Sequence, residues 1–184
     1  MTAQDQAALR AAAALHGKLA RASAVARGNS LWYVVFGVAS ALFAVSGPEW
    51  VDLAQGVLVA AVGAAQLRES PRLARGAAGA AGALARNELI LMCGIIAYCA
   101  LRLTVLRPSG AELQAELGDT SALGIDVAAM TNSISSLLYG TLLAVTLVYQ
   151  GGLALYFRRR APLAERYVRE SPAWARETVE GLAG

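Results

Sequence analysis

The sequence has few of the side chains from which most catalytic and metal-binding sites are built. Its 184 residues include one histidine, His16, and two cysteines, Cys93 and Cys99. The chain therefore lacks the histidines within apolar segments that a haem or a histidine-based zinc site would need. The two cysteines are six residues apart, which is about 600° around a helix, so we do not expect their thiols to pair.

No catalytic motif compensates for this shortage. The sequence contains no nucleophile–base constellation, no phosphate-binding loop and no metal-ligand spacing. We therefore predict that the protein is not an enzyme, that it has no catalytic residues, and that it binds no cofactor or metal ion.

Charged residues are also scarce. They make up 16% of the chain, against about 25% in soluble domains, and the mean hydropathy is +0.48. Residues 127–157 form an uncharged run of 31 residues that stops at Arg158-Arg159-Arg160. A bilayer core requires about 20 apolar residues in a helix, so the chain is predicted to be a membrane protein. Its expected partners are the lipid bilayer and other membrane proteins, and no feature points to nucleic acid.

The apolar segments predict an all-α membrane protein built as a bundle of four transmembrane helices. The spans are expected at 31–47, 51–67, 89–106 and 133–157, within a membrane domain of residues 29–157. Trp32 and Tyr33 begin the first span, as in the aromatic belt of a membrane interface. Residues 107–126 form the one sizeable outer loop.

The segments outside the spans are rich in alanine, the best helix former. Residues 1–28 predict an amphipathic helix, ended by Gly28-Asn29-Ser30, that either lies on the cytoplasmic membrane surface or forms a solvated tail. Residues 68–88 read as a basic loop, in which Ser70-Pro71 starts a helix. Residues 158–184 predict a cytoplasmic helical tail, in which Pro172 starts a second short helix.

Basic residues are divided unequally between the two sides of this topology. Segments 1–30, 68–88 and 158–184 contain 14 of the 16 lysines and arginines. Basic residues collect on the cytoplasmic side of membrane proteins. We therefore expect a bacterial-type inner-membrane protein with both termini in the cytoplasm.

The two halves of the chain resemble each other. Ala26-Arg27-Gly28-Asn29 leads into the first span and Ala85-Arg86-Asn87 leads into the third. Gly56 and Gln66 are ten residues apart in the second span, as are Gly140 and Gln150 in the fourth. This pattern predicts two pseudo-repeated hairpins related by an axis along the membrane normal.

Small residues mark candidate helix contacts, because packing between membrane helices depends on close approach of their backbones. The candidate helix-packing positions are Gly37, Gly56, Gly63, Gly94 and Gly140. We expect them to serve mainly packing within one chain, with self-association as the alternative.

A line of polar residues follows one face of the fourth span. Its members are Asn132, Ser136, Tyr139, Thr146 and Gln150, and Gln66 is the repeat counterpart of the last. Such a line avoids lipid and faces the bundle, a partner or water. We favour interhelical hydrogen bonding over a pore lining, because none of these side chains is charged. Asp52 and Arg102 are expected near the outer interface and Glu88 near the inner one.

The first hairpin also resembles a known family. A glycine in the first span, a turn proline at Pro48, and Gly56 with Gly63 in the return span are similar to the hairpin repeat of HdeD-type acid-resistance membrane proteins. The resemblance covers about residues 31–67 and, more loosely, 89–106. It implies a non-enzymatic envelope protein and transfers no functional residue. The chain departs from that family in having four spans rather than six, and a longer outer loop.

These observations favour a non-catalytic structural or accessory subunit that packs with itself, as a homo-oligomer, or with a larger membrane complex. The alternative is an oligomeric channel or transporter for a small ion or solute, lined by the fourth span. A second alternative is a lipid-modifying membrane enzyme, which would depend on the acidic residues of the outer loop. These residues are Glu112, Glu116, Asp119 and Asp126.

Overall fold

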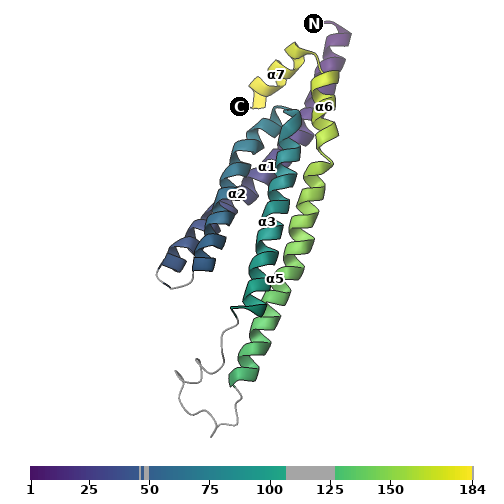
Figure 1. The fold of residues 1–184 in the computed structure, drawn as a ribbon. Helices are drawn as coiled ribbons and strands as arrows, with labels where there is room; N and C mark the ends of the chain where they lie inside the picture. Colours follow the sequence, from purple (N-terminus) through teal and green to yellow (C-terminus); the bar gives the residue numbers. More distant parts are fainter. Residues whose placement is uncertain (46, 48–49, 107–126, 184) are drawn as a thin grey trace.

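A computed structural model describes residues 1–45, 47, 50–106 and 127–183, and every regular element in them is an α-helix. The helices are α1 (Ala3–Val45), α2 (Trp50–Ala74), α3 (Ala78–Thr104), α5 (Val127–Arg158), α6 (Ala161–Glu170) and α7 (Ala173–Ala183) (Figure 1). Four helical segments are long and apolar enough to cross a membrane. The predicted all-α fold with four apolar spans is confirmed. The predicted outer loop, 107–126, lies outside the described residues.

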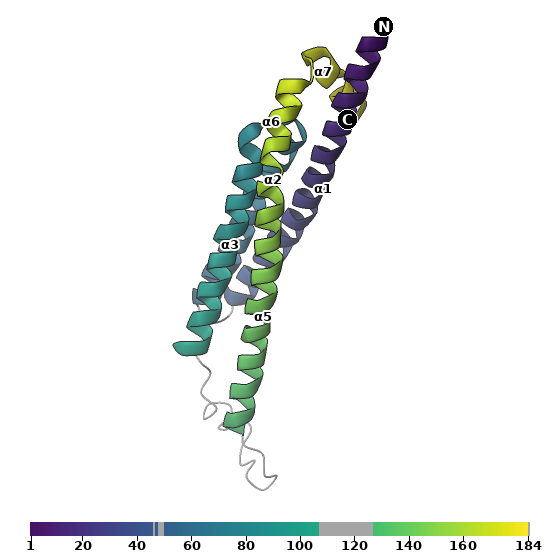
Figure 2. The same cartoon turned by 90° about the vertical axis from the view of Figure 1, so that its right-hand side faces the viewer.

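The four long helices form two hairpins. Helix α1 packs along α2, α3 packs along α5, and α2 joins the hairpins by packing on α3. Both termini lie at one end of the bundle, together with α6, α7 and the turn between α2 and α3 (Figures 1 and 2). We call this the termini end. At the opposite end, the loop end, α1 and α3 stop and α5 begins.

Helix α1 is one continuous helix, where we expected a separate surface helix over 1–28 followed by a span. A glycine inside a helix costs only about 1 kcal/mol, so Gly28 alone does not break it. One buried stripe runs through the expected break and includes Leu19, Ala26, Ser30 and Gly37. Packing along this stripe holds both parts of α1 in a single helix.

The segment 68–88 is helical, which corrects the loop predicted there. Helix α2 continues to Ala74 and α3 begins at Ala78. At the turn, Gly76 has a φ of +73°, a conformation that glycine adopts without strain. The Gly76 amide donates to the Leu73 carbonyl and the Ala77 amide to the Arg72 carbonyl, both at 3.0 Å. This pair of bonds is the Schellman ending of a helix.

Pro71 lies inside α2 and does not start a helix as predicted. Proline has no amide hydrogen to donate to the carbonyl four residues earlier. The Ser70 hydroxyl, 3.3 Å from the Leu67 carbonyl oxygen, donates in its place. The Ser23 hydroxyl of α1 donates to the Ser70 carbonyl at 2.7 Å. These side-chain donors allow α2 to extend past its proline.

The largest apolar core lies at the termini end. Leu19, Leu73, Leu84, Phe157 and Tyr167 are fully buried there, in a cluster completed mainly by alanines. Helices α6 and α7 contact α1, and the core that they share with it includes Ala12 and Leu19, so the apolar face of the first half of α1 is covered by protein. The tail breaks as expected, because α7 begins directly after Pro172.

Candidate functional site

A buried network of hydrogen bonds connects all four long helices. The Gln66 amide nitrogen of α2 donates to the Glu88 carboxyl group of α3 at 2.9 Å. The Tyr33 hydroxyl of α1 lies 3.3 Å from the other Glu88 oxygen and 3.1 Å from the side-chain oxygen of Gln150 on α5. The Ser30 hydroxyl lies 3.2 Å from the Gln66 side-chain oxygen. We call these five residues the polar network.

Four of the five members of the polar network are enclosed, and Tyr33 is half-buried. Ser30, Gln66 and Glu88 are 0% exposed and Gln150 is 5% exposed. No salt bridge among the described residues includes Glu88. Ionisable residues within membrane helices are rare, face the bundle interior and pair with polar groups. The Glu88 carboxyl group has its partners in two neutral side chains from two other helices.

Each member of the network occupies a position where its helix faces the bundle. In α2 the buried stripe runs from Gly56 through Gly63 to Gln66. In α3 the buried residues Leu84 and Leu91 lie one turn on either side of Glu88. Each of the four long helices therefore has a polar side chain at a core position. The five residues lie at the same height along the bundle axis.

The network brings together residues that no single pattern in the sequence links. For Gln66 and Gln150 the sequence favours interhelical hydrogen bonding, and both enter the network through Glu88 and Tyr33. Glu88 was expected among the interfacial charges, yet it is enclosed, because α3 begins ten residues before it and turns it toward α2. The sequence predicts Tyr33 to be part of an aromatic belt and carries no signal that its hydroxyl points inward. Its neighbour Trp32 is 59% exposed.

The predicted polar line on α5 does not share one environment. Thr146 and Gln150 are buried, Asn132 and Tyr139 are half-buried, and Ser136 is exposed. Only the half near the termini end is therefore buried in the bundle. The Tyr139 ring lies edge-on to that of Tyr98 on α3, with centroids 6.2 Å apart.

Asp52 and Arg102, predicted as charges near the outer interface, form an ion pair between α2 and α3. One guanidinium nitrogen donates to both Asp52 oxygens, at 2.6 and 2.5 Å. The Tyr98 hydroxyl donates to Asp52 at 2.9 Å. A cavity of about 650 Å³ opens beside them, and Ser40 and Gln55 contribute its other polar groups. The pair joins the two hairpins near the loop end.

The candidate packing glycines fall into three groups. A Cβ at Gly56 would lie 2.6 Å from the Ala41 amide nitrogen, and one at Gly63 would lie 2.8 Å from that of Val34. A Cβ at Gly37 would overlap the Ala60 amide nitrogen. At Gly94 it would meet side-chain atoms, those of Leu58 and, at 3.9 Å, the Gln55 side-chain oxygen, and at Gly140 nothing lies within 4 Å. The α1–α2 hairpin therefore depends on its glycines, and Gly140 does not contribute to packing within the described chain.

The described residues contain no group of three or more His, Cys, Asp or Glu side chains that could hold a metal ion. The outer-loop acids Glu112, Glu116, Asp119 and Asp126 lie outside the described residues. No family model, curated protein or solved structure matches the chain. The resemblance to HdeD-type proteins stays a prediction.

Proposed function

We propose that this multi-pass membrane protein is a non-catalytic structural or accessory subunit that associates through one flank of α5. The observation that supports this is the exposure of Ser136, Gly140 and Ala144 on that helix. They follow four-residue steps and so share one side of the helix. We call these three residues the α5 flank. The first candidate for its partner is a second copy of the chain, and another membrane protein is the alternative.

The α1–α2 hairpin supplies the physical argument for this assignment. There Gly37, Ala41, Gly56 and Ala60 bring two backbones into contact. In lipid, where no hydrophobic force drives helices together, such close approach supplies much of the packing energy. The α5 flank offers the same kind of surface, and the position of a Cβ at Gly140 is open. A helix from a second chain could approach α5 as closely as α1 approaches α2.

Cysteine cross-linking tests this flank. In a background with Cys93→Ser and Cys99→Ala, Gly140→Cys is expected to form disulfide-linked dimers in native membranes under mild oxidation. The control is Leu138→Cys, which is also exposed and lies about 200° around the helix; it is expected to remain monomeric. Equal cross-linking of both variants, or a monomer in native mass spectrometry of the wild type, would rule out self-association through this flank.

We further propose that the protein lies in a bacterial-type inner membrane with the termini end in the cytoplasm. The three segments that contain 14 of the 16 basic residues lie toward that end (Figure 1). Lysine and arginine collect on the cytoplasmic side of membrane proteins, which supports this orientation.

Accessibility to a membrane-impermeant maleimide tests the orientation. In the same cysteine-free background, Val105→Cys at the loop end is expected to label in intact cells. Leu182→Cys, which is 82% exposed at the termini end, is expected to label only after permeabilisation. Labelling of Leu182→Cys in intact cells would reverse the proposed orientation.

The second candidate function is an oligomeric channel or transporter. It is favoured by the enclosed Glu88 carboxyl group, because ionisable residues within membrane helices often mark an ion pathway. In an oligomer, the exposed Ser136 could border an aqueous path. We rank this function second because Glu88, Gln66 and Ser30 have no exposed surface in the single chain.

A further inference from the structure

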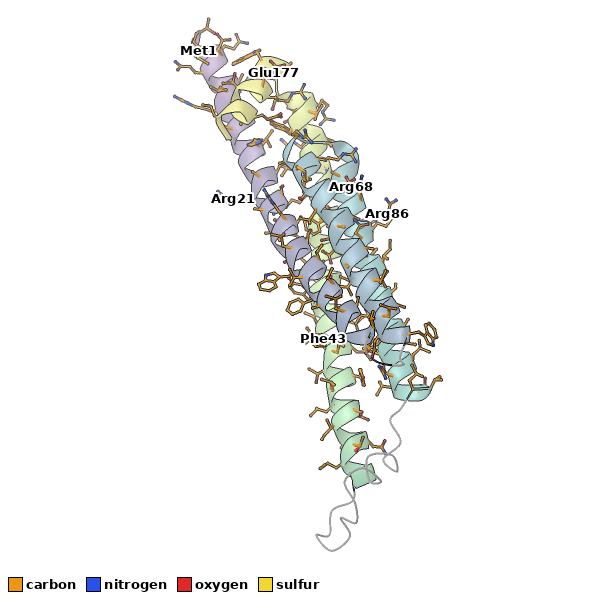
Figure 3. All side chains as sticks on the ribbon, turned by 90° about the vertical axis from the view of Figure 1, so that its left-hand side faces the viewer. Met1, Arg21, Phe43, Arg68, Arg86 and Glu177 are labelled. Atoms are coloured by element: carbon orange, nitrogen blue, oxygen red, sulfur yellow. The ribbon has the colours of Figure 1, made fainter. Side chains whose placement is uncertain are left out.

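A basic crevice lies between α2 and α3 at the termini end, apart from the polar network and the α5 flank. Its volume is about 580 Å³. It is lined by Arg68, Arg72, Arg75 and Arg86, with Glu69, Asn87 and two alanines, Ala65 and Ala83. The alanines leave room between the longer side chains. Figure 3 shows Arg68 and Arg86 close together at one edge of the bundle, with Arg21 at the opposite edge.

The charges around the crevice are unbalanced. Glu69 accepts a hydrogen bond from Arg72 at 2.8 Å. Arg68, Arg75 and Arg86 have no carboxylate partner among the described residues. Like charges four residues apart on a helix, such as Arg68 and Arg72, destabilise it. An anion in the crevice would remove this repulsion and would accept several charge-assisted hydrogen bonds at once.

The crevice begins where the apolar parts of the two helices end. The uncharged run of α2 stops at Leu67, and that of α3 starts at Leu89. The guanidinium groups therefore lie at the level of lipid headgroups if the apolar runs occupy the bilayer core. One helical turn from the crevice toward the loop end, Ala61 of α2 and Ile90 of α3 are exposed. Ala61 lies on the same side of α2 as Ala65, and Ile90 lies on the same side of α3 as Arg86. Acyl chains can lie on this apolar surface.

We propose that this crevice binds the phosphate group of an anionic phospholipid. The planar guanidinium group matches phosphate oxygens with paired donors. Basic pockets between membrane helices on the cytoplasmic side bind anionic headgroups in this way. Asn87 supplies an amide for the hydroxyl or ester oxygens of the headgroup. The apolar surface beside the crevice, formed by Ala61 and Ile90, favours a phospholipid over free phosphate. Free phosphate has no acyl chain to contact that surface, so it would gain no binding energy there.

The test is lipid binding to the purified full-length protein, measured by native mass spectrometry and by the shift in melting temperature on titration. The probes are phosphatidylglycerol, phosphatidylcholine and inorganic phosphate, each added to protein in a neutral detergent. The wild type is expected to retain phosphatidylglycerol in preference to phosphatidylcholine. Arg68→Gln with Arg86→Gln is expected to weaken phosphatidylglycerol binding about thirtyfold, because each arginine near the headgroups contributes severalfold.

The matched control is Arg21→Gln with Arg27→Gln, two exposed arginines on α1. It removes the same charge near the same level of the bundle and is expected to leave the affinity within about twofold, since distant exposed charges are screened. Equal weakening in both double variants would show diffuse attraction and overturn the proposal. Inorganic phosphate binding as tightly as phosphatidylglycerol would overturn the lipid assignment.

A conservative variant keeps the proposal testable if the glutamine variant does not fold. If Arg68→Gln with Arg86→Gln yields no folded protein, Arg68→Lys with Arg86→Lys keeps both charges but removes the paired donors. It is expected to bind phosphatidylglycerol severalfold more weakly than the wild type. Unchanged affinity in the lysine variant would overturn the proposal that guanidinium groups hold the phosphate.

Discussion

Gly56→Leu is expected to leave little or no folded protein. A Cβ at this position would lie 2.6 Å from the Ala41 amide nitrogen and 2.9 Å from the Gly37 carbonyl oxygen. Both are backbone atoms, so neither can rotate away as a side chain would. The two helices would have to separate along their shared surface, at a cost above the 1–3 kcal/mol that is typical, roughly, of overpacked cores. The measurement is the yield of monodisperse protein in detergent and its melting temperature.

Gly140→Leu is the matched control for this prediction. It makes the same change in a membrane helix, but nothing lies within 4 Å of the new Cβ. The variant is expected to fold with the melting temperature of the wild-type monomer. It also blocks the α5 flank, so a loss of dimers without a loss of folding would be its expected signature. Normal folding of Gly56→Leu would show that α1 and α2 do not approach as closely as described.

Gly56 also illustrates what a single sequence can predict. The number of spans follows from uncharged runs, since a bilayer requires apolar length whatever the details of packing. The small residues of the first two spans then predict a close hairpin. A glycine does not indicate which way it faces, however, and Gly140 has the same spacing from Gln150 as Gly56 has from Gln66. One contacts backbone and the other is open, because the rotation of α5 against α3 depends on contacts along both helices.

The ends of the helices were harder to predict than the spans. Charge marks where an apolar run leaves the membrane but does not mark where the helix stops. In 68–88 the glycines and Pro71 suggested a loop, whereas alanine has the strongest helix propensity. Buried contacts of Leu73 and Leu84 in the apolar core decide in favour of helix. The break falls at Gly76, where the chain needs a positive φ.

The polar network was only partly predictable for a related reason. A polar residue in an apolar run signals a buried partner, and this identified Gln66 and Gln150. Which partner each finds depends on the rotation and tilt of four helices. Glu88 and Tyr33 provide the connection between them, and neither could be paired with a glutamine from spacing alone.

Gln66→Leu is expected to destabilise the protein more than any other single change in the polar network. Gln66 donates to Glu88 and its side-chain oxygen lies 3.2 Å from the Ser30 hydroxyl, and all three side chains are fully buried. Loss of the amide leaves a Glu88 oxygen enclosed without a donor. An unsatisfied buried polar group costs about 1–3 kcal/mol, and more if it is charged. We expect a fall in melting temperature of roughly 5 °C, measured in detergent.

Two substitutions are matched to this one. Gln150→Leu removes a single contact, the one with the Tyr33 hydroxyl. That hydroxyl still reaches Glu88. The loss of stability in Gln150→Leu should therefore be near the average of about 0.6 kcal/mol for hydrogen bonds between membrane helices. Glu88→Gln keeps the shape of the side chain and an acceptor for the Gln66 amide, and it is expected to melt close to the wild type. If all three variants melt together, the network does not hold the helices.

The same Glu88→Gln variant distinguishes the two leading functions, because it is expected to alter the carboxyl group without unfolding the bundle. For a structural or accessory subunit, wild type and Glu88→Gln in proteoliposomes should both show no flux of protons, Na⁺ or K⁺ above that of empty liposomes. For a transporter that uses the enclosed carboxyl group, wild-type flux should be clear and should fall at least tenfold in Glu88→Gln at an unchanged melting temperature. We expect the first result, because the carboxyl group is already engaged by Gln66 and Tyr33 and has no exposed surface. The second result would show that the polar network is an ion site. The proposed function would then be that of a transporter and not of an accessory subunit.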